Sequence, residues 1–110
     1  MSEQVFQVAW TDVARRDLIE IAEYISRQSP TAALQLVERI ERRCETLKSM
    51  PSRGRIPPEL ARFRVHQYHE LLIEPYRVFY RIEDSSVTVL AVFDGRRDLE
   101  DVLIGRLLSF

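Results

Sequence analysis

The chain has 110 residues, of which 45% are hydrophobic and 30% charged, and its formal net charge is −1. This composition predicts one globular domain over residues 1–110 and argues against both a disordered tail and a basic nucleic-acid coat protein. No apolar run approaches the roughly 18 residues of a membrane helix, and the N-terminus has no signal-peptide pattern. We therefore expect a cytoplasmic protein with no membrane segment.

The first predicted elements are a strand and a helix. Residues 5–10 alternate in character, which predicts a strand whose even-numbered side chains share one apolar face. Thr11 is a suitable N-cap for a helix over residues 12–28. The apolar stripe of this helix comprises Ala14, Leu18, Ile21, Ala22 and Ile25.

A second helix follows directly. Ser29 can cap its first turn, and Pro30 suits the first helical position, where a missing N–H costs nothing. The helical pattern runs to Met50 and stops at Pro51. Its apolar stripe comprises Ala33, Val37, Ile40, Cys44 and Leu47. Two helices joined by so short a turn should form an antiparallel hairpin.

Three more strands are predicted after a proline-rich loop at residues 51–60. They cover residues 64–74, 76–83 and 87–93, and their close spacing indicates an antiparallel meander. A short C-terminal helix should follow, with Asp98 as its cap and Asp101 completing a capping box. The residues expected on its apolar face are Leu99, Val102, Leu103 and Leu107.

This order of elements predicts an α+β fold. An N-terminal strand and a helical hairpin should pack on a small, mostly antiparallel sheet, with the order β-α-α-β-β-β and a short C-terminal helix. If the helices cover one face of the sheet, the other face is left free for binding.

The stretch "YRVFYRIE" bears directly on that free face. Its alternation places Val78 and Tyr80 toward the core and Arg77 and Arg81 on the opposite side. Arginine is the residue suited to bidentate recognition of carboxylates and phosphates, and fifteen of the sixteen basic residues are arginines.

Other arginines should join this face. In an antiparallel meander, Arg96 and Arg97 should lie close to Arg77, and Arg55 in the proline-rich loop is a further candidate. One interpretation is a surface that binds an acidic partner. The other is a solvated strand face whose arginines form local ion pairs with Glu70, Asp94 or Asp98.

Metal and nucleophile chemistry have little support in the sequence. The only histidines, His66 and His69, are three residues apart in a predicted strand and should point to opposite faces. Cys44 is the only cysteine, and its place on a helical apolar stripe predicts a core residue. The three glycines form no phosphate-binding loop. We expect no metal and no cofactor.

Four motifs in order along nearly the whole chain resemble the RelE/ParE family, the toxins of bacterial type II toxin–antitoxin modules. They are W-T-x-x-A-x-x-D-L, M-P-x-x-G-R-x-x-P-E-L, P-Y-R-V-F-Y-R-I and V-F-D-G-R-R-D. The resemblance implies a helical hairpin on a small sheet, as expected above. It also implies a cognate antitoxin as partner, with a homodimer or a toxin–antitoxin hetero-oligomer as the assembly.

The family divides by target, so the resemblance leaves open whether the chain is an enzyme. A RelE-like member is a ribosome-dependent mRNA endonuclease. That activity would use Arg77 and Arg97 on the scissile phosphate and His69 or Glu70 as the proton carrier. His69 and Glu70 should face opposite sides of their strand, and Leu103 stands where some members have a terminal-helix tyrosine.

A ParE-like member instead inhibits DNA gyrase by binding it, and this is the interpretation that the residues favour. The arginine face would then bind an acidic antitoxin segment, and the cellular target could compete for part of it. The residues expected there are Arg55, Arg77, Arg81, Arg96 and Arg97. A third reading is a non-toxic relative that retains only antitoxin binding.

Overall fold

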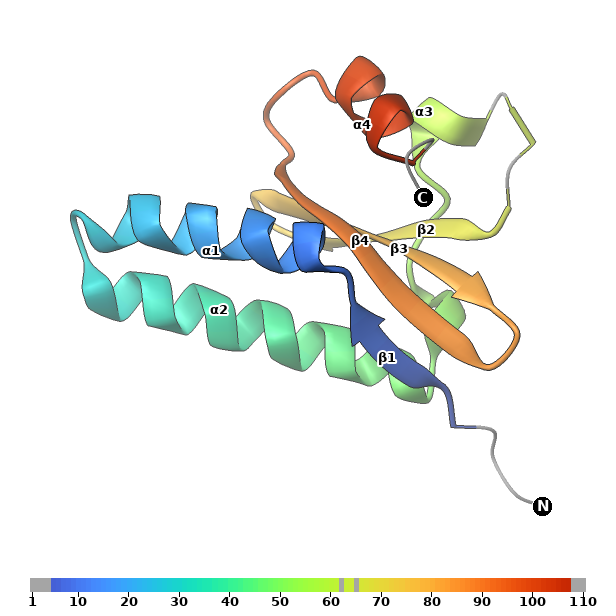
Figure 1. Cartoon of the computed structure of the whole chain (residues 1–110), viewed down its shortest axis with the longest axis horizontal. Helices are drawn as coiled ribbons and strands as arrows, with labels where there is room; N and C mark the ends of the chain where they lie inside the picture. The colour runs from blue at the N-terminus through green and yellow to red at the C-terminus, as the bar shows by residue number, and fades with distance from the viewer. Residues whose placement is uncertain (1–4, 62, 65, 108–110) are drawn as a thin grey trace.

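The computed structural model describes residues 5–61, 63–64 and 66–107. Its strands and helices follow each other in the predicted order (Figure 1). In addition, a short 3-10 turn follows the second helix, and a second 3-10 turn and a short helix lie in the proline-rich loop. The elements are β1 (Gln7–Trp10), α1 (Asp12–Ser26), α2 (Pro30–Glu45), η1 (Thr46–Lys48), η2 (Pro51–Arg53), α3 (Pro58–Ala61), β2 (Tyr68–Ile73), β3 (Tyr76–Glu83), β4 (Ser86–Asp94) and α4 (Glu100–Leu107). None of the described helices is long and apolar enough to cross a membrane.

Both predicted helix caps are confirmed. The Thr11 hydroxyl accepts a hydrogen bond from the Ala14 N–H at 3.0 Å, and the Ser29 hydroxyl accepts one from the Ala32 N–H at 3.1 Å. The helices are shorter than expected, because α1 ends at Ser26 and α2 ends at Glu45. Beyond Glu45 the chain tightens into the 3-10 turn η1, where the periodic apolar pattern continues without an α-helix.

The sheet has four strands in the order β1-β4-β3-β2. β2 and β3 pair antiparallel, as do β3 and β4, which confirms the meander. β1 lies parallel to β4, with Gln7 opposite Ser86 and Trp10 opposite Val89. Parallel strands cannot be joined by a tight turn, and here the helical hairpin, β2 and β3 all lie between β1 and β4 in the chain.

One face of the sheet carries the main core with the hairpin. Apolar residues of α1 and α2 pack there against Val78, Tyr80, Val87 and Val89. Cys44 lies in this core, and burial raises the pKa of its thiol to about 12, which keeps the thiol protonated. The prediction that the even-numbered residues of β3 face the core is therefore confirmed.

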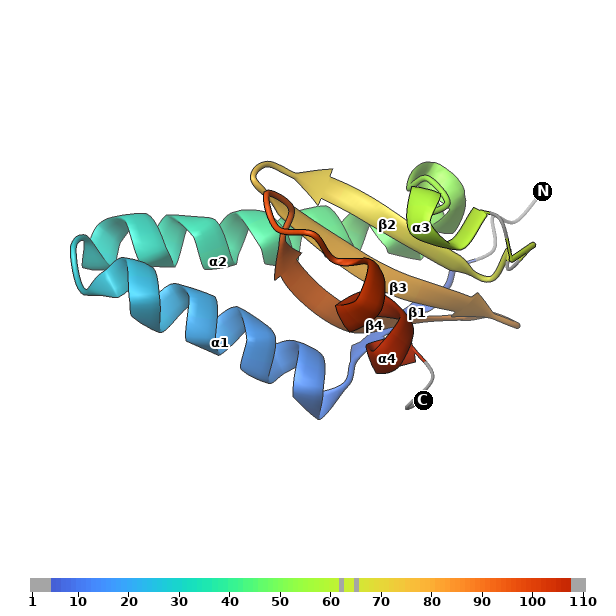
Figure 2. The same cartoon turned by 90° about the horizontal axis from the view of Figure 1, so that it is seen from above.

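The prediction that the opposite face is free is wrong. A second hydrophobic cluster covers much of it, in which Leu99, Leu103 and Leu107 of the α4 segment pack against Phe79 and Phe93. α4 and the short helix α3 both lie on this side of the sheet (Figure 2). The residues that cover this face of the sheet therefore come from two segments, α3 and α4, that are distant from each other in sequence.

The start of the C-terminal helix also differs from the prediction. α4 begins at Glu100, and the Asp98 carboxylate accepts from the Glu100 N–H at 3.3 Å, two residues ahead. Val102, expected on the apolar face, is 43% exposed. Leu99, Leu103 and Leu107 are buried, because only these residues recur at the four-residue spacing that keeps one side of the helix on the sheet.

Candidate functional site

Arg77 lies on the second face of the sheet and is held by two carboxylates. Its Nε donates to Glu70 Oε1 at 2.6 Å and its Nη2 to Glu70 Oε2 at 2.7 Å. Its Nη1 and Nη2 also donate to the two Glu59 oxygens at 2.7 and 2.8 Å. The Arg77 side chain is only 11% exposed. An anion from outside would have to displace one of these carboxylates.

The Glu70 side chain is fully buried, and its partners are the reason that its burial is tolerated. An unpaired carboxylate removed from water would cost several kcal/mol. Besides Arg77, Arg55 donates from Nε to Glu70 Oε2 at 3.2 Å. Within residues 5–61, 63–64 and 66–107, the network therefore balances two carboxylates against two guanidinium groups. The hydrogen bonds from Arg77 lower the pKa of Glu59, and the two carboxylates raise the pKa of Arg77.

The loop before α3 is fastened next to this network. The Tyr80 hydroxyl donates to Pro51 O at 2.7 Å and accepts from the Gly54 N–H at 3.0 Å. A Cβ on Gly54 would collide with the Glu70 carbonyl oxygen and the Tyr80 hydroxyl. Only glycine therefore allows the loop to lie this close to β2, where Arg55 can reach Glu70.

Arg81 is the next arginine on the same face of β3. Its side chain is 22% exposed, and its Nε lies 3.6 Å from Glu83 Oε2. That Nε is buried and has no hydrogen-bond partner within the described residues. Arg81 is therefore less completely paired than Arg77.

Arg96 and Arg97 lie in the turn after β4 and are exposed. Arg96 donates to both oxygens of Asp94, at 3.0 and 2.7 Å, and these bonds lower the pKa of Asp94 to about 2. Gly95 passes directly over the Arg77 side chain, where an added Cβ would lie 2.9 Å from Arg77 Cγ. The predicted proximity of this turn to Arg77 is confirmed.

The remaining nuclease candidates are divided between the two faces of the sheet. Glu70 points to the Arg77 side, whereas His69 stacks on Tyr80 on the hairpin side, with ring centroids 5.6 Å apart. Burial lowers the pKa of His69. The prediction that His69 and Glu70 face opposite sides is confirmed, and the fold does not bring His69 together with Arg77. His66 precedes β2 and is exposed.

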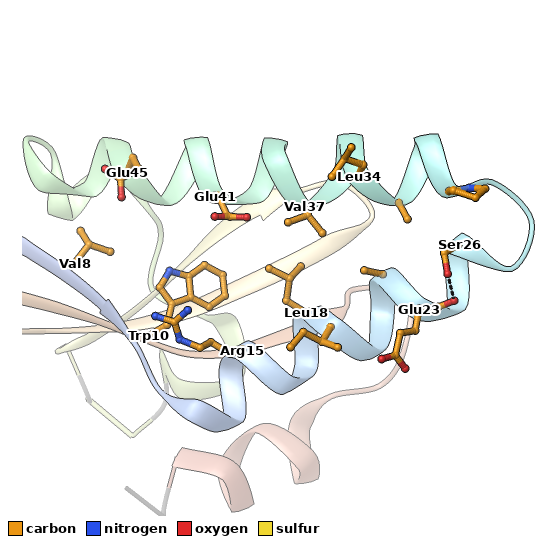
Figure 3. A pocket seen from close by; sticks show the side chains of 14 residues that line it. Val8, Trp10, Arg15, Leu18, Glu23, Ser26, Leu34, Val37, Glu41 and Glu45 are labelled. Atoms are coloured by element: carbon orange, nitrogen blue, oxygen red, sulfur yellow. Dashed lines mark hydrogen bonds between the residues drawn. The ribbon is translucent and has the colours of Figure 1, made fainter.

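A groove of about 670 Å³, which was not expected from the sequence, lies between α1 and α2. Trp10, Leu18 and Val37 point into the space between β1 and the two helices (Figure 3). Ile19 and Leu34 lie at its margin and are 53% and 61% exposed. The signal was present in the sequence, because these two residues are apolar but fall outside the stripes that form the core.

Comparison with known proteins gives a family. Residues 8–99 match the family described as ParE toxin of type II toxin-antitoxin system, parDE. A relative from Sinorhizobium fredii (strain NBRC 101917 / NGR234), described as "Putative toxin Y4kP", is 32% identical over 99 residues, which cover 88% of this chain and 96% of the relative.

Two solved structures resemble the fold. One is titled as the chromosomal ParDE TA system from P. aeruginosa; the TM-score is 0.67 at 22% identity, over 83% of this chain and 97% of that one. The other is titled as the toxin-antitoxin complex RelBE2 from Mycobacterium tuberculosis; the TM-score is 0.52 at 25% identity, over 84% and 94%. The chain belongs to the ParE toxin family of type II toxin–antitoxin systems.

Proposed function

We propose that this ParE-family toxin inhibits DNA gyrase by binding it, without catalysing a reaction of its own, and that a cognate antitoxin neutralises the toxin by direct contact. Family membership supports the toxin role. The choice of gyrase over the ribosome rests on the arrangement of the candidate site residues.

This choice rests on one observation, the pairing of the Arg77 guanidinium with two carboxylates of the same chain. A ribosome-dependent nuclease needs a guanidinium that can meet a phosphate and a nearby group that moves a proton. Here four hydrogen bonds direct the Arg77 guanidinium to Glu59 and Glu70. His69 lies on the other face of the sheet. The geometry therefore favours a structural role for Arg77 and a toxin that acts through its surface.

We propose that the groove between α1 and α2 is the binding site for the antitoxin. Grooves of this kind accept the apolar face of an amphipathic helix, whose anchors recur every three or four residues. Exposed Ile19 and Leu34 offer contacts at the margin, and Trp10 offers a large aromatic surface inside. Solved relatives titled as toxin–antitoxin systems or complexes support a protein partner.

The charged residues around the groove suggest the chemistry of that helix. The lining includes three glutamates, Glu23, Glu41 and Glu45, against one arginine, Arg15. We therefore expect basic residues beside the apolar face of the antitoxin helix, in place of the acidic segment expected from the arginine face alone. Trp10 is the only tryptophan, so its emission should shift to shorter wavelength when the antitoxin purified with this toxin is added. An unchanged emission despite tight binding would place the antitoxin elsewhere.

The function is tested by inducing the chain in bacteria and following DNA and protein synthesis by pulse labelling. Inhibition of gyrase predicts that DNA synthesis falls first while translation continues. In parallel, the purified chain should inhibit supercoiling by purified gyrase. An early fall in translation, with intact supercoiling activity, would instead indicate a RelE-like nuclease. A chain that affects neither process would be a relative that retains only antitoxin binding.

A further inference from the structure

A second concave surface, distinct from the groove, lies between α1, the adjoining ends of β3 and β4, and α4. We call it the α1–α4 pocket and define it by Tyr24, Tyr76, Phe93, Arg97 and Arg106, which are among its lining residues. Its volume is about 390 Å³. The pocket thus joins elements from both ends of the chain.

Hydrogen bonds and a cation–π contact connect the elements that line the α1–α4 pocket. Arg106 donates to the two Asp17 oxygens at 2.8 and 3.1 Å, and Asp17 also accepts from the Val92 N–H at 3.1 Å. The Arg106 guanidinium lies 4.9 Å from the centre of the Phe93 ring. These contacts tie α1, β4 and α4 together. A partner that docks here would therefore meet a preorganised surface.

The turn at the rim leaves one guanidinium available. The Arg96 guanidinium donates to both carboxylate oxygens of Asp94, and the Arg96 backbone N–H also donates to this carboxylate at 2.9 Å. The turn is further closed by the Arg97 N–H, which donates to Asp94 O at 3.3 Å. Within the part of the chain that the structure describes, no ion pair engages the exposed Arg97 side chain. Arg97 is therefore placed to receive a carboxylate from another molecule.

The aromatic residues make this a surface suited to protein recognition. Tyr24 is 70% exposed on α1, and Tyr76 lies half-buried at the start of β3. Tyrosine and arginine are enriched among the residues that dominate binding at protein interfaces. Here the two tyrosines and Arg97 line the same pocket.

The charges favour a protein over a nucleic acid as the occupant. The carboxylates of Asp17, Glu20 and Asp94 also line the pocket and balance its three arginines, so the lining has no net positive charge to attract a run of phosphates. Arg106 and Arg96 already neutralise two of these carboxylates. A folded protein can present a carboxylate to Arg97 and a basic or neutral group beside Glu20.

The α1–α4 pocket and the groove use opposite sides of α1. A helix turns roughly 100° per residue, so two sets of residues that differ by about half a turn face away from each other. The groove is lined by Arg15, Leu18, Ile19, Ala22, Glu23 and Ser26 of α1. The pocket is lined by Asp17, Glu20, Ile21 and Tyr24. A helix lying in the groove would leave the pocket side of α1 uncovered.

We propose that the α1–α4 pocket is the surface through which the toxin holds its target protein, and that Arg97 there binds a carboxylate of that target. This inference rests on the proposed function and adds the site to it. The target contact and the antitoxin contact then lie on different sides of α1.

The test compares Arg97→Glu and Tyr24→Ala with Arg42→Glu as a matched control. Arg42 is an exposed arginine of α2 that lines neither the groove nor the pocket. Each full chain is assayed for growth arrest on induction and for inhibition of supercoiling by purified gyrase. Circular dichroism on each variant establishes that it is folded. Arg97→Glu should raise the concentration needed for half-inhibition by at least about tenfold and relieve arrest, since it replaces attraction with repulsion.

Each outcome bears on the proposal. If Arg97→Glu arrests growth as well as wild type and Arg42→Glu do, the pocket is not the target surface. If wild type arrests growth without inhibiting gyrase, the proposed function fails, but relief of arrest by Arg97→Glu and Tyr24→Ala still supports the pocket. If wild type binds a labelled single-stranded RNA and Arg97→Glu does not, the occupant is a nucleic acid and the proposal is overturned. A wild-type chain that does not arrest growth overturns both proposals.

Discussion

Arg77 on β3 packs against Gly95 of the turn that also carries Arg97, but the two guanidinium groups have opposite surroundings. Arg77 is 11% exposed and held by Glu59 and Glu70. Arg97 is exposed, and the ion pair in its turn goes to Arg96 instead. Arg77 thus forms ion pairs that link parts of the chain, whereas the guanidinium of Arg97 can bind a group of another molecule. What separates them is whether a carboxylate from elsewhere in the chain reaches the guanidinium.

Arg77→Ala should therefore have the largest effect on stability. Among the described residues it leaves the buried Glu70 with only the half-exposed Arg55 as an ion-pair partner, and breaking a buried pair in this way costs about 3–5 kcal/mol. Urea unfolding followed by circular dichroism measures the loss. Arg96→Ala is the matched control, because the exposed pair with Asp94 contributes little and its loss should shift the unfolding midpoint far less than Arg77→Ala does. A wild-type midpoint for Arg77→Ala would mean that the network is not structural.

Glu59→Gln should cost less, about 1–3 kcal/mol, because it weakens two charge-assisted hydrogen bonds but leaves Glu70 paired. Arg77 holds the pKa of Glu59 below its ordinary 4.5. The ionised Glu59 therefore contributes its full stabilisation above about pH 4.5, and this contribution is lost as the pH falls through the lowered pKa of Glu59. The stability difference between wild type and the variant should be largest near neutral pH and disappear in acid. A difference independent of pH would contradict the ion pair.

Gly95→Ala probes the point where the two regions meet, and its expected cost is smaller, about 1–2 kcal/mol from overpacking. The added methyl would lie 2.9 Å from Arg77 Cγ and 2.9 Å from Pro75 O, and the second of these is backbone that cannot easily shift. Gly105→Ala in α4 is the control, since its methyl meets nothing within 4 Å, and alanine in a helix should keep or raise the stability of wild type. If Gly95→Ala unfolds at the same urea concentration as wild type, the close approach of the turn to Arg77 is not tight.

The local features of this fold were predictable from sequence. The caps at Thr11 and Ser29 and the alternation of β3 depend on residues close together in the chain, and all three are present. The proximity of the Arg96–Arg97 turn to Arg77 followed from the meander, because antiparallel strands fix which ends meet.

What the sequence could not show depends on residues that meet across long separations. The cover on the second face of the sheet comes from α3 and α4, and Glu59 reaches Arg77 across 18 positions. The apolar face of α4 is visible as a periodic pattern, but the surface that it covers is not, and the contact between Glu59 and Arg77 leaves no pattern at all. The sequence alone therefore does not distinguish Arg77 from Arg97. Only the fold shows that Arg77 is ion-paired within the chain and that Arg97 is exposed.

The most direct measurement determines stability and growth arrest on the same variant, Arg97→Glu. We expect the variant to keep the unfolding free energy of wild type, because the Arg97 side chain is exposed and no ion pair engages it within the described residues. We also expect it to lose growth arrest. A folded variant that still arrests growth would show that Arg97 does not contact the target. So would a variant whose toxicity falls only in proportion to a loss of stability.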